Sequence, residues 1–66
     1  MHFLRLTDIN GKDVRIDPQK VCFARELDPD ENGEPLTFIS FGDSYVIVKG
    51  DIENTTDLIV AVALLK

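Results

Sequence analysis

An unbroken apolar run near the C-terminus constrains this chain more than any other feature. Residues 58–65 read LIVAVALL and contain no polar side chain. A membrane span takes about 20 such residues, so eight must be covered by protein. The chain has 66 residues and is expected to form a single domain (1–66). A domain of this size buries only about 60% of its unfolded surface. One side of the run can therefore pack on the chain while the other stays exposed.

The run predicts a short helix and an interface. Asn54 is a good N-cap residue and Asp57 follows three positions later, as in a capping box, which favours a helix over 56–65. The run is rich in β-branched residues, so a strand is the alternative. A segment that is apolar on all sides exposes one of them in either form. We therefore expect self-association, with a candidate interface made of Leu58, Ile59, Val60, Val62, Leu64 and Leu65.

The rest of the chain is typical of short antiparallel strands. Asn10-Gly11 is a strong hairpin signal because both residues tolerate positive φ, and Asp17-Pro18 marks a corner. Glycine and proline also punctuate 28–35 and 42–44. The expected strands are 3–7, 13–16, 21–27, 36–41 and 45–49. The fold class is therefore mainly β (β-rich α+β): a small five-stranded antiparallel, meander or barrel-like sheet with a short C-terminal apolar helix.

No residue pattern indicates catalysis. Cys22 is the single cysteine and lies in an apolar stretch without a nearby histidine, so we interpret it as a small core residue. One cysteine and one histidine also exclude a zinc site of the usual Cys/His type. We expect no enzymatic activity and no cofactor.

The acidic turn DPDENGE, residues 28–34, superficially resembles a calcium loop. Asp28, Asp30, Asn32 and Gly33 occupy positions 1, 3, 5 and 6 of such a loop. The twelfth position, which needs a bidentate carboxylate, is Ile39. We therefore interpret the segment as a hairpin tip built from turn-forming residues, and expect no metal.

The net charge of −5 disfavours binding to a nucleic-acid polymer. Basic residues are nevertheless concentrated in residues 1–25, and guanidinium groups suit phosphate geometry. The candidate residues for binding a small anionic ligand are Arg5, Arg15, Arg25 and Tyr45. The alternative is that these arginines pair with nearby acidic side chains.

The first residues, MHFLRLTD, carry charged and polar groups too early for the apolar core of a signal peptide. We expect a cytoplasmic location, in the producing cell or in an infected host, and no membrane partner.

The pattern of Leu6–Lys12, Ile16-Asp17-Pro18, Val21, Gly42 and Tyr45–Lys49 resembles the small flagellar and swarming-motility proteins of the FlbD family. Similar short chains also occur in phage genomes. The resemblance implies a small β-rich fold and a non-enzymatic role, with no catalytic residues to carry over. Residues 50–53 and the strongly apolar C-terminal segment depart from the family pattern.

The sequence thus predicts a non-enzymatic interaction module that self-associates, as a phage or motility accessory protein that binds a partner. The alternative is an oligomer that binds or sequesters a small nucleotide-like anion, such as a phage-encoded inhibitor of host defence.

Overall fold

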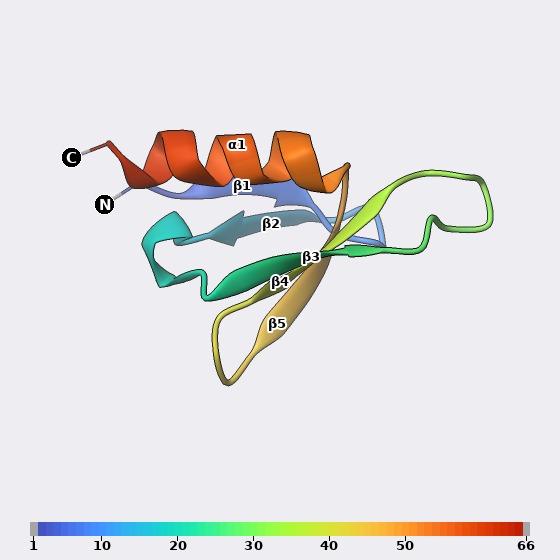
Figure 1. Cartoon of the computed structure of the whole chain (residues 1–66), viewed down its shortest axis with the longest axis horizontal. Coiled ribbons are helices and arrows are strands. Elements are labelled where there is room, and N and C mark those ends of the chain that lie inside the picture. The colour runs from blue at the N-terminus through green and yellow to red at the C-terminus, as the bar shows by residue number, and fades with distance from the viewer. Residues whose placement is uncertain (1, 66) are drawn as a thin grey trace.

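The computed structural model describes residues 2–65. This part of the chain forms five strands and one C-terminal α-helix, arranged as in Figure 1, which confirms the β-rich α+β class. The elements are β1 (Leu4–Thr7), β2 (Asp13–Ile16), the short 3-10 helix η1 (Pro18–Lys20), β3 (Phe23–Leu27), β4 (Leu36–Ser40), β5 (Tyr45–Lys49) and α1 (Ile52–Ala63).

The strands divide into two antiparallel sheets. β1 and β2 form a hairpin, and β3, β4 and β5 form a three-stranded meander. Among the described residues, a single bridge between Asp8 and Val48 joins the two sheets. β1 and β5 also lie in contact, although they belong to different sheets.

Helix α1 covers the inner side of both sheets. It contacts β1, β3, β4 and η1, and Figure 1 shows it running along β1. Alternate residues of each strand point towards it, as a pleated strand requires. The buried apolar core consists of Leu4, Leu6, Ile16, Ile39, Val48 and Ile59.

The helix begins earlier than the sequence predicts. Asp51, not Asn54, is the N-cap, and its carboxylate accepts a hydrogen bond from the Asn54 N–H at 3.4 Å. Gly50 makes this early start possible, since its φ of +127° lets the chain turn sharply out of β5. The helix is confirmed over the strand alternative, but it ends at Ala63. Leu64 and Leu65 therefore lie beyond it.

The connection between β5 and α1 is anchored to β4. Thr37 on β4 is fully buried, and its hydroxyl donates a hydrogen bond to the Gly50 carbonyl oxygen at 2.9 Å. The Gly50 N–H donates to the Pro35 carbonyl oxygen at 3.0 Å. These two bonds satisfy polar groups that would be costly to bury unpaired.

Ile39 is the most informative position for testing this core, because it is 0% exposed at the centre of the meander. Ile39→Ala is expected to lower the free energy of unfolding by about 2–5 kcal/mol, most of what a domain of this size has available. Urea denaturation followed by circular dichroism measures the loss.

The matched control is Ile9→Ala, since Ile9 is exposed at the β1–β2 turn. It should change stability by no more than about 0.5 kcal/mol. Equal losses in the two variants would mean that Ile39 is not at the core.

Candidate functional site

The three-stranded sheet leaves one side uncovered. Directly opposed residues of antiparallel strands point to the same side of a sheet. The register therefore places nine residues together on the side away from α1, which we call the outer face: Phe23, Ser40 and Tyr45; Arg25, Phe38 and Ile47; Leu27, Leu36 and Lys49.

Three aromatic rings form a row across the outer face. The centroids of Phe23 and Phe38 are 5.8 Å apart, and those of Phe38 and Tyr45 are 5.0 Å apart. The Arg25 guanidinium lies 5.5 Å from the Phe23 centroid and 5.9 Å from that of Phe38, within cation–π range. Phe23 is 46% exposed and Tyr45 is 65% exposed. The row is therefore ordered by its own contacts yet open to a ligand or partner.

The outer face is also basic. Arg25 and Lys49 are its two charged residues, whereas the chain as a whole has a net charge of −5. Glu26 falls on the opposite side of the sheet by strand alternation, in register with Thr37. The surface is therefore complementary to an anionic group, although the protein is acidic.

The four candidate anion-binding residues lie in two pairs on different sheets. Arg5 and Arg15 face each other across the β1–β2 hairpin, while Arg25 and Tyr45 lie on the outer face. Arg5 forms an ion pair with Asp13 at 2.9 Å, as the alternative interpretation of the arginines expects. Both partners are exposed, so this pair contributes little to stability. Only the Arg25–Tyr45 pair is combined with an aromatic surface.

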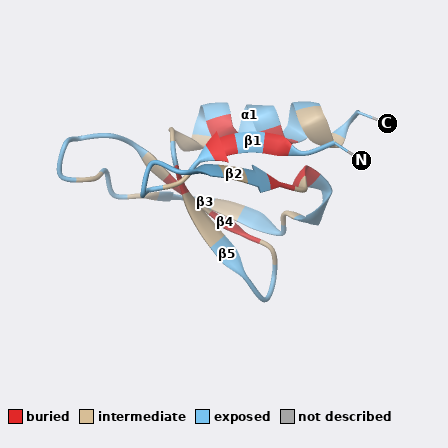
Figure 2. Cartoon of the chain, turned by 180° about the vertical axis from the view of Figure 1, so that it is seen from behind, coloured by how far each residue is buried: buried red, intermediate tan, exposed pale blue. Residues whose placement is uncertain are grey.

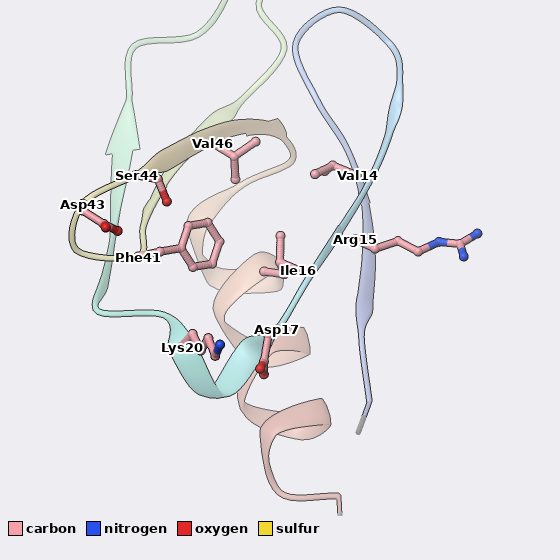
Figure 3. A pocket seen from close by; sticks show the side chains of 9 residues that line it. All are labelled: Val14, Arg15, Ile16, Asp17, Lys20, Phe41, Asp43, Ser44 and Val46. Atoms are coloured by element: carbon pink, nitrogen blue, oxygen red, sulfur yellow. The ribbon is translucent and has the colours of Figure 1, made fainter.

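A pocket of about 380 Å³ opens between β2 and the β4–β5 turn. Val14, Ile16, Phe41 and Val46 make its apolar floor (Figure 3). Its polar rim consists of Asp17, Lys20, Asp43 and Ser44. Arg15 is also at this pocket, but its side chain points away from it in Figure 3. Nothing in the sequence marked this pocket, because its walls are far apart along the chain.

The helix uses part of the candidate interface for its own core. Ile59 is buried, and Val62 is partly buried against the core. The other four candidate interface residues are exposed, and we call them the helix patch: Leu58, Val60, Leu64 and Leu65.

Cys22 corrects a sequence expectation, because it is exposed and does not lie in the core. Strand β3 begins one residue later, at Phe23, and Val21 packs against the core instead. The backbone N–H of Cys22 donates a hydrogen bond to the Ser40 carbonyl oxygen at 2.8 Å. The short 3-10 corner before it sets which of these two residues points inwards.

The acidic turn is one of two loops with the same hydrogen bonds. In the sequence DENGE, Asp30 Oδ1 accepts bonds from the Asn32 and Glu34 N–H groups, both at 2.9 Å. In DINGK, residues 8–12, Asp8 Oδ1 accepts the equivalent bonds from Asn10 and Lys12 at 2.9 Å. The repeated D-x-N-G pattern was visible in the sequence and was missed. Both aspartates are thus engaged in holding turns.

No group of three or more His, Cys, Asp or Glu side chains within residues 2–65 is arranged to hold a metal ion. Over the same residues, no helix is long and apolar enough to cross a membrane.

No protein-family model, curated protein or solved structure matches this chain. The resemblance to the FlbD family therefore stays a prediction. The fold and surfaces define a small α+β domain with an exposed aromatic face, an exposed helix patch and an apolar pocket with a charged rim.

The loop geometry predicts that Asp30→Ala lowers the free energy of unfolding by about 1 kcal/mol, because two backbone N–H groups lose their acceptor. Asp8→Ala should have a similar effect, and Glu31→Ala, at an exposed position without such bonds, serves as the control. Adding Ca²⁺ should leave the wild-type Tm unchanged. A calcium-dependent rise in Tm that Asp30→Ala abolishes would contradict the turn interpretation.

Proposed function

We propose that this chain is a non-enzymatic interaction module that self-associates, in the role of a phage or motility accessory protein. One observation carries the proposal. Among residues 2–65, eight large hydrophobic side chains are exposed and only six hydrophobic residues are buried. A domain that exposes more large apolar side chains than it buries is suited to bind other protein surfaces.

The exposed hydrophobic residues are clustered, which distinguishes them from the isolated ones found on most proteins. Four form the helix patch, and Phe23 and Tyr45 lie on the outer face. Figure 2 shows buried residues where α1 lies against β1 and exposed ones along the opposite side of the helix. The two clusters occupy opposite layers of the fold, so one can serve self-association while the other stays available to a partner.

The helix patch is suited to pairing with a second copy. Leu58 and Ala61 are three positions apart within α1, so they share one side of the helix, and Leu65 follows just beyond its end. A two-fold antiparallel pair places Leu58 of one copy beside Leu65 of the other. The acidic side chains of Glu53 and Asp57 belong to the first half of the helix and lie towards the ends of such a pair.

Self-association predicts a solution mass above 7.4 kDa, the mass of one chain. Leu58→Asp is expected to return the protein to that mass, because Leu58 is an exposed residue of the helix patch and the substitution places a charge in the apolar contact. Size-exclusion chromatography with light scattering, at several protein concentrations, measures the mass.

Ile9→Asp is the matched control, since it adds the same charge at an exposed isoleucine outside the patch. Its mass should equal that of the wild type. A wild type that runs as a 7.4 kDa monomer at every concentration would refute self-association, and equal dissociation by both variants would refute this interface.

A second candidate function is supported by the outer face: binding or sequestering a nucleotide-like anion, as an inhibitor of host defence would. The aromatic row offers rings for stacking, and Arg25 and Lys49 supply positive charge. Arg25 is held over two of the rings, so little side-chain freedom remains to be lost on binding. Residues of a second copy would be needed to enclose a ligand on so open a surface.

This candidate predicts that a nucleotide raises the Tm of the wild type. Arg25→Ala should weaken that binding at least about tenfold, since a bond to a charged group is lost. Arg15→Ala on the other sheet is the control and should bind as the wild type does. A thermal-shift assay with a panel of mono- and dinucleotides tests this prediction. If none of them changes the Tm of the wild type, nucleotide binding by the outer face is refuted.

A further inference from the structure

We propose that the pocket between β2 and the β4–β5 turn binds a small zwitterion with an apolar body, of the class of the free α-amino acids. This site is separate from the helix patch and from the outer face, and it does not depend on the function proposed for them.

The floor of the pocket is a part of the core that the chain leaves open. Val14, Phe41 and Val46 pack against the buried core yet are themselves only partly buried. They surround Ile16, which is buried at the end of β2. The pocket lies between β2 of one sheet and the β4–β5 turn of the other, and these four side chains line it. An apolar group that entered it would gain contacts with four side chains and lose its exposure to water.

The size of the pocket limits the ligand. Its volume of about 380 Å³ is near the lower end of the range for small-molecule sites, about 300–1,000 Å³. Its mouth is open to solvent, so a charged end of the ligand can remain hydrated. These features fit a short branched or aromatic side chain with a polar head at the rim.

The rim carries both signs of charge. Lys20 belongs to η1, and Asp43 and Ser44 belong to the β4–β5 turn (Figure 3). Neither Lys20 nor Asp43 forms an ion pair with another described residue. The pocket thus offers one ammonium group and one carboxylate, each without a charged partner, at the edge of one apolar floor.

Asp17 adds a second carboxylate, but part of its capacity is already used. Its Oδ1 accepts a hydrogen bond from the Gln19 N–H at 3.0 Å, which begins η1 and so places Lys20. The other carboxylate oxygen has no such bond. Asp17 therefore positions Lys20 and can strengthen the negative side of the rim.

A zwitterion matches this rim better than a ligand with a single charge. Its carboxylate is complementary to Lys20, and its ammonium group is complementary to Asp43, with the Ser44 hydroxyl available to either. A simple amine would leave Lys20 unmatched, and a simple carboxylic acid would be repelled by the two aspartates.

The test uses the intact protein and four small molecules in NMR titrations. L-leucine carries a carboxylate, an ammonium group and an apolar body. 3-Methylbutylamine lacks its carboxylate, 4-methylpentanoate lacks its ammonium group, and glycine lacks the apolar body. Leucine is expected to shift the backbone amide signals of residues 14–20 and 41–46. Each of the other three molecules should bind at least about tenfold more weakly, because each lacks one group of contacts.

Two variants assign the binding to the rim. Lys20→Met keeps most of the length of the side chain and removes its charge, and Asp43→Asn keeps the shape and removes the charge. Both residues are exposed, so the fold should be retained, which circular dichroism checks. Each variant should weaken leucine binding at least about tenfold, and Arg15→Met, whose side chain points away from the pocket, should not.

Three results would overturn the proposal. They are the absence of saturable shifts with leucine at millimolar concentration, equal binding of leucine and of 3-methylbutylamine, and shifts centred on the outer face. The last two would assign the binding to a simple amine or to another surface.

Discussion

The packing of α1 across both sheets is the contact on which this fold depends. Within residues 2–65 the two sheets share only one backbone bridge, so hydrogen bonding alone does not fix their relative position. Ile59 packs with Leu4 and Leu6 of one sheet and with Ile39 and Val48 of the other in a single cluster. Hydrophobic burial at that cluster must compensate for the entropy lost on folding, and only one side of the helix takes part in it.

The three exposed features follow from this one-sided packing. Residues 2–65 form two layers, and the elements they contain do not cover the outer surface of either layer. The helix patch is the uncovered side of one layer, and the outer face is the uncovered side of the other. The pocket lies between β2 of one sheet and the β4–β5 turn of the other. The shortage of covering residues was predictable from length and composition, but the positions of the uncovered surfaces were not.

The sequence predicted those parts of the structure that local physics determines. The Asn10-Gly11 signal predicted the hairpin that joins β1 and β2, and the register of that hairpin sets Arg5 opposite Arg15. The sequence did not predict the exposed position of Cys22. A shift of one residue where the chain leaves the 3-10 corner determines whether Val21 or Cys22 points into the core. The contact of Arg25 with Phe38 depends on the β3–β4 register. The pocket depends on how two sheets are set apart, so no local pattern encodes either feature.

The two D-x-N-G loops, at residues 8–12 and 30–34, have a consequence for how the sequence of this chain can evolve. In each copy, a single aspartate and a glycine with a φ of 79° satisfy the geometry of the turn, while Ile9 and Glu31 occupy the same exposed position. Neither residue is needed for the backbone bonds, and the loops already differ there in charge and hydrophobicity. Figure 1 shows both loops projecting from the same end of the molecule. That end is therefore a place where new surface chemistry can arise by point mutation while the core stays the same.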